Sequence, residues 1–379
     1  MVDVLSRCSQ LVYKKAIKPA LFKKPPDYVH ETMIQYAQHR ELLRLSRILH
    51  FMWAYDNPAV LAQKIGSVSF ANPIGLSAGL DKNAQLPPIC QRIGFGFSTV
   101  GSISAEPCAG NPKPWFYRLP KSQALVVNAG LPNDGAARVG AQLDKLSLGI
   151  TATFPIVASI ARTNSARACS EEAAILDYCI SAKRLNAVAG VRALEINISC
   201  PNTYGGEPFT TPEKLSRLLA ALRATHSTKP LWIKMPINLP WHEFQPLLEV
   251  ACRYNVQAVT IGNLNKNRGE IPSGELPSQV KGNLSGRPTQ ALSNALIAKT
   301  YLHYNDRLTI IGVGGVFNAH DAYQKIRLGA SLVELITGLI YEGPQLIGQI
   351  NRDLVSLLQK DGLSSIGEAI GLDAQAAAQ

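Results

Sequence analysis

Residues 309–338 read TIIGVGGVFNAHDAYQKIRLGASLVELITG, and this stretch decides the fold. It begins with an apolar run over 309–315, which predicts a buried strand, and it ends with a second such run over 332–338. Between the two runs, apolar residues recur at helical spacing over 318–328, which predicts an amphipathic helix. Strands that are joined through a helix pair in parallel, so the stretch is one β-α-β unit.

The same unit repeats along most of the chain. Eight strand-like runs follow residue 70, at 72–78, 97–103, 155–161, 193–199, 231–236, 258–264, 309–315 and 332–338. Helical patterns lie after most of them, at 170–185, 211–225, 241–254, 289–304, 318–328 and 343–360. Eight units predict an α/β fold, a (β/α)8 TIM barrel over residues 66–379. A doubly wound open sheet is the alternative, but it needs fewer strands and a glycine fingerprint after the first strand.

Two insertions interrupt this rhythm, over residues 104–154 and 265–288. Long loops in compact barrels are typically lids or substrate loops, so we expect both to lie near a functional site.

The N-terminal segment, residues 1–65, differs from the rest of the chain. Helical patterns cover 4–23 and 27–53, and Pro25 and Pro26 separate them. Residues 1–24 carry six lysines and arginines against one acid. A basic amphipathic helix pair is typical of a segment that lies on a membrane surface. A helical cap that packs on the main domain is the alternative.

The composition narrows the classes of function. Hydrophobic residues make up 46% of the 379 residues, which excludes a disordered chain. No apolar run reaches about 18 residues, so no transmembrane span is predicted. The seven cysteines and seven histidines show no metal-ligand spacing, so no metal site is predicted. The net charge of +11 suits an anionic small molecule or a membrane surface. Basic residues are not interleaved with aromatic ones, so we expect no nucleic-acid partner.

Glycines follow the last two predicted strands. Gly314 and Gly315 come after the seventh strand, and Gly338 follows Thr337 after the eighth. Each group precedes a helix, where free backbone amides and the helix dipole favour an anion, so a phosphate site is predicted there. Tight turns without a ligand are the alternative.

Cys200 lies at the end of the fourth predicted strand, in NISCPNT (197–203). A proline follows it, which places the thiol on a loop, where a thiolate could act as a base or a nucleophile. Asn197 and Asn202 flank it and could pair with an amide or a carboxylate of a substrate. A small buried hydrophobic residue is the alternative reading of the cysteine.

Two lysines, Lys82 and Lys234, also follow predicted strands. An inward lysine there would stabilise an anion, such as a substrate carboxylate or a reduced cofactor ring, whereas surface lysines are the alternative. Asn128 in VVNAGLPNDG (126–135) could reach a polar ligand or could serve a turn.

Taken together, the motifs resemble those of the dihydroorotate dehydrogenase family. The matching segments are GLSAGLDKNA (75–84), GNPKPWFYRL (110–119), NISCPNT (197–203), NLSGRP (283–288), GVGG (312–315) and GASLVELITGLIYEGP (329–344). The N-terminal helix pair is similar to that of the class 2 members, which lie on the membrane and admit quinone between these helices. Cys200 stands where class 2 members usually carry serine, and it resembles the cytosolic class 1 enzymes in this respect.

The resemblance implies a noncovalent FMN in the mouth of the barrel, with dihydroorotate over its ring and Cys200 as the base. The implied substrate contacts are Lys82, Asn128, Asn197, Asn202 and Asn263. The implied flavin contacts are Ala78, Gly79, Lys82, Ser102, Asn197, Lys234, Gly286, Gly314, Gly315, Thr337 and Gly338. The chain departs from the family pattern at Ser159, Leu264, Asn283 and Ile336.

The implied function is oxidation of dihydroorotate to orotate in UMP synthesis, with electrons passing from FMN to a quinone. The implied location is the membrane periphery, on the cytoplasmic face in a bacterium. A related FMN enzyme that uses fumarate or another acceptor is one alternative, and a related enzyme acting on another dihydropyrimidine is a second. A phosphate-binding barrel without redox chemistry is a third.

Overall fold

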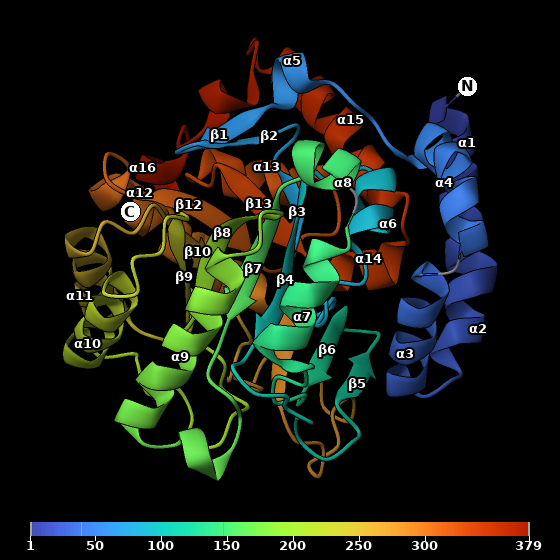
Figure 1. Ribbon diagram of the computed structural model, residues 1–379. Coiled ribbons are helices and arrows are strands. Elements are labelled where there is room, and N and C mark those ends of the chain that lie inside the picture. The colour runs from blue at the N-terminus through green and yellow to red at the C-terminus, as the bar shows by residue number, and fades with distance from the viewer. Residues whose placement is uncertain (1, 39, 147, 378–379) are drawn as a thin grey trace.

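A closed barrel of eight parallel strands forms the centre of the computed structural model, which describes residues 2–38, 40–146 and 148–377 (Figure 1). Its strands are β3 (Ile74–Leu76), β4 (Phe97–Ile103), β7 (Ile156–Ile160), β8 (Val191–Asn197), β9 (Leu231–Met235), β10 (Ala258–Ile261), β12 (Thr309–Val313) and β13 (Leu332–Leu335). Neighbours in the barrel follow chain order, and β13 pairs with β3 to close the ring. The predicted TIM barrel and all eight predicted strands are confirmed.

Helices surround the barrel, and the longer ones bury one face each in the interior of the protein. They are α6 (Pro87–Arg92), α7 (Gly135–Asp144), α8 (Leu148–Thr153), α9 (Glu171–Asn186), α10 (Pro212–Arg223), α11 (Trp241–Arg253), α12 (Gln290–Tyr304), α13 (Ala319–Arg327), α14 (Thr337–Glu342), α15 (Leu346–Lys360) and α16 (Ala374–Ala377). In α10, for example, Leu215, Leu218, Leu219 and Leu222 are buried, which is the spacing of one helical face. The six helices predicted between and after the strands are confirmed.

A short hairpin closes the end of the barrel from which the strands start. It consists of β1 (Gln63–Ile65) and β2 (Val68–Phe70), and α5 (Pro58–Leu61) precedes it. The ring of Phe70 packs edge-on against that of Phe97 inside the barrel, with centroids 5.1 Å apart. This end is therefore filled with apolar side chains, and the other end is left for a site.

The two insertions come together in one small antiparallel sheet over the carboxyl ends of the strands. Its strands are β5 (Phe116–Leu119) and β6 (Ala124–Val127) from the first insertion, and β11 (Asn283–Gly286) from the second. Both insertions were expected to be loops, and this sheet was not predicted. Strands of four residues give a weak pattern, and β11, one of the two partners of β6, is about 160 residues away in the sequence.

The N-terminal helices stand beside the barrel, at the right of Figure 1. They are α1 (Val2–Val12), a π-helical turn (Tyr13–Ile17), α2 (Lys18–Phe22), α3 (Pro26–Ala37) and α4 (Arg40–Trp53). The single helix predicted over 27–53 is wrong, because the chain leaves α3 at Gln38, whose N–H bonds the carbonyls of Gln35 and Tyr36. Apolar residues continue on both sides of this break, so the pattern could not reveal it. Within the described residues, every helix is too short or too polar to cross a membrane.

Candidate active site

A cavity of about 720 Å³ opens at the carboxyl ends of the barrel strands, and we call it the main cavity. Its inner end is lined by predicted site residues: Ala78, Gly79, Lys82, Ser102, Asn197, Cys200, Asn202, Lys234, Asn263 and Thr337. Its outer end is lined by N-terminal residues: Tyr13, Ile17, Leu21, Phe22, Pro26, Val29, His30, Met33, Ile34, Tyr36, Ala37 and Trp53. The main cavity thus connects the mouth of the barrel with the space beneath the N-terminal helices.

A smaller cavity of about 100 Å³, the glycine pocket, adjoins it. Gly314, Gly315, Thr337 and Gly338, which the sequence suggested for a phosphate, all line this pocket together with Gly286. Seven residues line both cavities, so the two form one continuous site: Ala78, Lys234, Asn263, Leu264, Ser285, Ile336 and Thr337.

The backbone of the glycine pocket requires glycine at its turn. Gly314 has φ +109° and Gly315 has φ +71°, a region that other residues rarely adopt. A Cβ atom on Gly314 would also collide with the side chain of Thr289. Because these glycines carry no side chain, the main chain itself forms this part of the pocket wall. Such a wall suits a ligand that is held by backbone amides.

Cys200 follows β8 in the turn that begins at the barrel mouth, and it lines the main cavity. Desolvation by burial raises the pKa of its thiol to about 11. Glu207 raises this pKa further, whereas Lys234 and Arg162 lower it. The thiol is therefore protonated at neutral pH in the free protein, and the nearby cations favour loss of that proton.

Hydrogen bonds fix Asn197 at the inner end of the main cavity. Its Nδ2 donates to Ser102 Oγ at 2.8 Å, and Ser102 in turn lies 2.9 Å from Ser159 Oγ. Its Oδ1 accepts from the backbone N–H and the hydroxyl of Ser199. Ser159 therefore supports Asn197 through Ser102.

The other two cavity asparagines are fixed in the same way. Asn202 Nδ2 donates to the carbonyl of Val127 at 2.8 Å, and its Oδ1 accepts from Asn283 Nδ2 at 2.8 Å. Asn263 Nδ2 donates to the carbonyl and the hydroxyl of Ser199, both at 2.7 Å. Three amide groups thus surround one polar space and have restricted orientations, as a planar substrate with several polar atoms requires.

Two lysines, the buried Lys234 and the partly buried Lys82, add positive charge to this polar space. Lys234 is 5% exposed, and its Nζ donates to Ser77 Oγ at 3.2 Å. Lys82 Nζ lies 2.9 Å from Nε2 of His30, which belongs to α3. Burial, together with Lys82 and Lys113, lowers the pKa of His30 to about 3, so the neutral imidazole accepts the hydrogen bond. Burial lowers the pKa of Lys82 to about 8.

Asn128 is the one predicted site residue that lines neither cavity. Its Oδ1 accepts from Asn111 Nδ2 at 3.1 Å, whereas its neighbours Val127 and Ala129 line the main cavity. The structure thus places Asn128 behind the wall, where it holds the turn around Asn111.

The comparisons with known proteins fit this geometry. Residues 60–358 match the model of a family described as dihydroorotate dehydrogenase. The chain belongs to this family. It is 35% identical over 377 residues to a dihydroorotate dehydrogenase (quinone) of Deinococcus deserti, covering 96% of this chain and 100% of that one. It is 32% identical over 383 residues to the mitochondrial dihydroorotate dehydrogenase (quinone) of Arabidopsis thaliana, covering 95% and 81%.

A solved structure of the same family is also similar. The dihydroorotate dehydrogenase of Eimeria tenella, in complex with ferulenol, superimposes with a TM-score of 0.79 at 27% identity. The match covers 92% of this chain and 95% of that one. The relatives named as quinone enzymes align along the N-terminal helices as well as the barrel, so the chain resembles the quinone-dependent class throughout its length.

Dihydroorotate dehydrogenases are flavin enzymes, and the residues of this site fit a flavin. Lys234 is a buried cation at the junction of the two cavities and has Ser77 as its hydrogen-bond partner. The glycine pocket offers main-chain walls next to it, and the hydroxyls of Ser285 and Thr337 lie 3.0 Å apart at its edge. A cation for a ring and a main-chain pocket for a phosphate are the two features that a flavin nucleotide needs.

Ser77, His30 and Asn283 take part in this site and were not predicted as site residues from the sequence. Ser77 stands five residues before Lys82 in a quoted motif, so its position at a strand end was readable. His30 lies in the N-terminal segment, and no pattern in that segment points toward the barrel. Asn283 was recognised only as a departure from the family pattern, and its bond to Asn202 depends on pairing between the two insertions.

Proposed function

We propose that the protein oxidises dihydroorotate to orotate with FMN as its flavin, and that a quinone then accepts the electrons. The observation that carries the proposal is the continuity of the main cavity. It is polar and asparagine-rich at the barrel mouth, and apolar between the N-terminal helices. One cavity therefore offers a place for a polar pyrimidine and a place for an apolar acceptor.

The mouth of the barrel supplies the groups for the first half of the reaction. Asn197, Asn202 and Asn263 would hold the amide and carbonyl groups of dihydroorotate, and Lys82 would pair with its carboxylate. Cys200, as a thiolate, would remove the proton from C5 while the hydride leaves C6. FMN, when bound, supplies the hydride acceptor.

The remaining predicted residues would hold the cofactor. Lys234 would stabilise the negative charge of the reduced ring, because a buried cation acts strongly where water is excluded. Ala78, Gly79 and Ser102 line the main cavity beside this lysine, and the glycine pocket would receive the phosphate.

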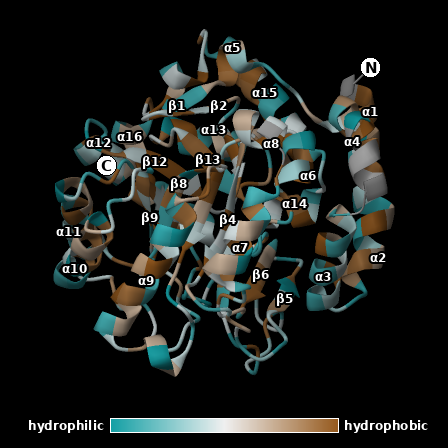
Figure 2. Ribbon diagram, viewed as in Figure 1, coloured by the Kyte–Doolittle hydropathy of each residue, from teal (hydrophilic) through white to brown (hydrophobic). Residues whose placement is uncertain are grey.

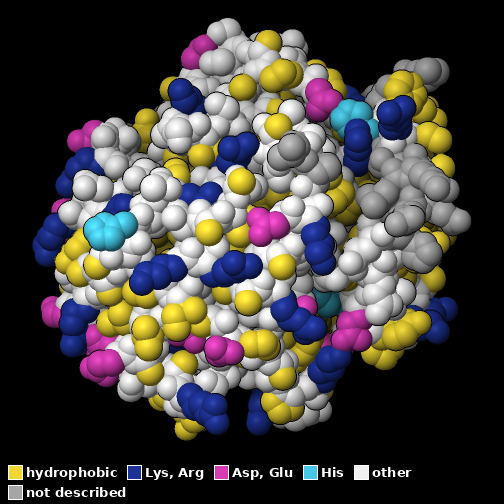
Figure 3. All heavy atoms as spheres, viewed as in Figure 1, with side chains coloured by type: hydrophobic (Ala, Val, Ile, Leu, Met, Phe, Trp, Pro, Cys, Tyr) yellow, Lys and Arg dark blue, Asp and Glu magenta, His cyan; other side chains and the backbone are white. Residues whose placement is uncertain are grey.

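The N-terminal helices would bring the protein to the membrane and admit the quinone. Large apolar side chains on these helices face solvent: Val4, Leu11, Val12, Ile17, Tyr28, Met33, Tyr36, Leu45, Ile48 and Phe51. Figure 2 shows hydrophobic residues along these helices, and Figure 3 shows them at the outer edge of the molecule. Such a surface would place the protein at the periphery of the membrane, on the cytoplasmic face in a bacterium. Binding to phospholipid vesicles in a flotation assay would test this.

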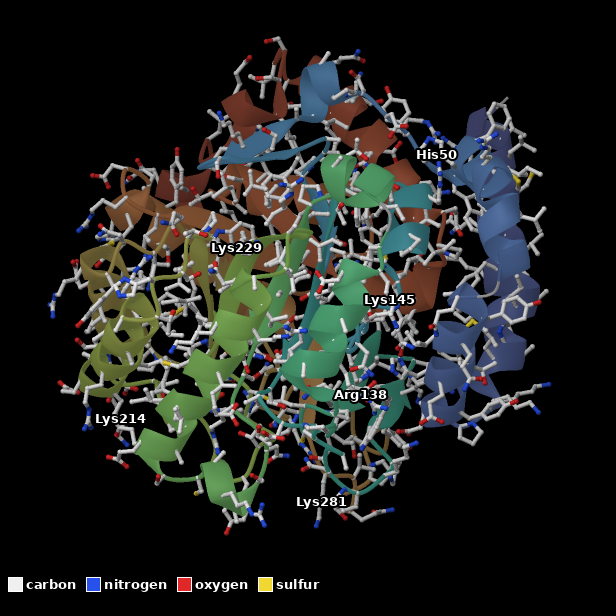
Figure 4. All side chains as sticks on the ribbon, viewed as in Figure 1. His50, Arg138, Lys145, Lys214, Lys229 and Lys281 are labelled. Carbon is white, nitrogen blue, oxygen red and sulfur yellow. The ribbon has the colours of Figure 1, made fainter. Side chains whose placement is uncertain are left out.

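We assign residues 1–65 to membrane binding and quinone access, and residues 66–379 to the FMN-binding barrel. Basic residues of the barrel are spread over several elements: Figure 4 labels Arg138 and Lys145 at α7, Lys214 on α10, Lys229 before β9 and Lys281 before β11. The apolar exposed residues gather on the N-terminal helices, which favours this segment as the membrane-facing part.

Anaerobic addition of dihydroorotate to the purified protein tests the proposal. We expect a yellow protein from which FMN is released on denaturation, and bleaching of its visible absorption by dihydroorotate with formation of orotate. Bleaching by dihydrouracil instead would assign another dihydropyrimidine as the substrate. A colourless protein that takes up no FMN would refute the proposal.

A further inference from the structure

The interior of the barrel contains a layer of four polar side chains. They are Thr260 of β10, Glu334 of β13, Thr99 of β4 and Glu195 of β8, and each is at most 1% exposed. These strands alternate around the barrel, and four residues from alternate strands form one interior layer of a TIM barrel. Such layers are normally filled by valine, isoleucine and leucine, so an acidic layer calls for a physical reason.

Hydrogen bonds across the interior confirm that these side chains point inward. Thr99 Oγ1 donates to Glu334 Oε1 at 2.5 Å, although β3 lies between their strands. Thr260 Oγ1 donates to Glu195 Oε2 at 2.7 Å, although β9 lies between theirs. Each glutamate therefore has one oxygen bound to a threonine.

The two glutamates face one another across the axis, because β8 and β13 are four strands apart in a ring of eight. The second oxygen of each, Glu195 Oε1 and Glu334 Oε2, is buried and has no hydrogen-bond partner among the residues that the structure describes. Two buried carboxylates that face one another cannot both ionise at low cost, whereas one proton on the pair removes the repulsion and supplies a donor.

The layer is closed on the hairpin side and coupled to the site on the other. Trp232, Phe97 and Phe70 fill the barrel on the hairpin side with apolar rings. Toward the mouth, Lys234 is the charged group that faces the layer, and it reaches Ser77 at the end of β3. Burial and Glu195 raise the pKa of Glu334 to about 7, whereas Lys234 and the hydroxyls of Thr99 and Ser77 lower it.

We propose that Glu195 and Glu334 share one proton and, through Lys234, set the net charge beside the cavity that would hold the flavin ring. The inference rests on the proposed function for its effect on the flavin. With one proton on the pair, the pair carries −1 and Lys234 carries +1, so the region is neutral. Loss of that proton leaves a net charge of −1, which opposes the arrival of electrons above it. The two glutamates are positioning residues, because they act on the ring through Lys234.

The proton balance gives a measurable slope. Above the pH at which the pair loses its proton, each two-electron reduction draws one proton from water onto one of the two carboxylates. The reduction potential of the flavin should then fall by a further amount of about 30 mV per pH unit, which is a tenfold change in the equilibrium constant of a two-electron reduction. This further slope adds to the slope that protonation of the ring itself causes. Below that pH the further slope should vanish.

Spectroelectrochemical titration of the FMN-loaded protein between pH 6 and 9 tests this. Glu334→Gln and Glu195→Gln each leave one carboxylate opposite Lys234, so the region stays neutral at every pH in this range. Each variant should therefore lack the further slope and keep the contribution to the potential that the wild type shows at low pH. Glu249→Gln on α11, which removes a glutamate bound to Tyr304 on the outer surface, should keep the wild-type slope. A slope unchanged in both interior variants would overturn the proposal.

Infrared spectroscopy provides a test that needs neither the variants to fold well nor the flavin to be bound. The wild-type protein, with or without FMN, should show the carbonyl stretch of a protonated carboxylic acid at pH 6, and this band should be lost by pH 9. The band should be absent in Glu334→Gln or Glu195→Gln, whichever can be prepared. If no such band exists in the wild type, the pair holds no proton and the inference fails, even if FMN binds and dihydroorotate bleaches it.

Discussion

The mouth of the barrel and the N-terminal helices line the same cavity in opposite ways. At the mouth, polar side chains hold one another, as in the chain from Asn197 through Ser102 to Ser159. Between the helices, most of the lining is apolar, and His30 is a polar exception where it meets Lys82. Other polar contacts attach the helices outside this lining, such as the ion pair of Lys14 with Glu342. A fixed polar network binds a molecule in one orientation, whereas an apolar channel admits one without fixing it.

This difference implies that the two halves of the proposed reaction can be damaged separately. A change at the mouth should slow reduction of the flavin with every electron acceptor. A change between the helices should slow reoxidation by a quinone and spare reoxidation by a small soluble acceptor.

The largest effect is expected at Cys200. Cys200→Ala should slow flavin reduction by dihydroorotate about 10²- to 10⁴-fold, since a positioned base contributes a factor of this order. In the wild type, the rate should rise with pH over the neutral range, because the thiolate is the active form and burial raises the pKa of the Cys200 thiol to about 11. Stopped-flow absorbance under anaerobic conditions measures this rate.

Cys200→Ser separates the base from its surroundings. This variant should retain some turnover. Because serine is a far weaker acid than cysteine, the pH dependence of the rate should shift upward. Cys252→Ser on α11, away from the main cavity, should behave like the wild type. An unchanged pH profile in Cys200→Ser would remove Cys200 from the mechanism.

The residues proposed for the mouth could be read from the sequence because they are local to the strand ends, and the structure brings them to one cavity. Cys200, Asn197 and Asn202 fall within six positions of one strand end, and the alternation of strands and helices places all such ends together. Asn128 lies differently, because its Oδ1 accepts from Asn111 Nδ2 and the residue lines neither cavity. This orientation depends on the small sheet of β5, β6 and β11, whose pairing is invisible in the sequence.

The N-terminal segment was predicted only in part. Its helices could be read from apolar spacing, but the break after Ala37 and the contact of His30 with Lys82 could not. Both depend on how the helices dock on the barrel, and docking of one apolar surface on another leaves no periodic signal in either segment.

An intermediate effect is expected from Val29→Trp, which narrows the helix end of the main cavity. Val29 is partly buried and lines this end, so the indole would occupy space that a quinone needs. Reoxidation by a quinone should slow about tenfold, which corresponds to about 1.4 kcal/mol. Reoxidation by fumarate or a soluble dye, if the protein accepts them, should stay within about twofold.

Val4→Trp is the matched control, because Val4 is 63% exposed on α1 and does not line the main cavity. Equal slowing of quinone and soluble-acceptor reactions by Val29→Trp would mean that both use the same route, and the separation of the two regions would be wrong.

The smallest effect concerns the attachment of the helices to the barrel. Asp27 is 8% exposed, and its Oδ1 accepts a hydrogen bond from the backbone N–H of Trp115 at 2.9 Å. Asp27→Ala leaves that N–H without its charged acceptor, which costs about 1.5–3 kcal/mol for such a bond. Local opening of α3 should therefore become at least about tenfold more frequent, as measured by hydrogen exchange of its amides, while flavin reduction by dihydroorotate stays unchanged.

Two variants show whether this bond or the charge alone holds the helix. Asp27→Asn keeps an oxygen acceptor, so it should recover most of the protection, whereas Asp56→Ala, which removes an exposed carboxylate paired with His50, should leave α3 as in the wild type. If Asp27→Ala slowed flavin reduction as strongly as it loosened α3, then helix docking would control the mouth through His30 and Lys82. The two ends of the cavity would then be one mechanical unit rather than two.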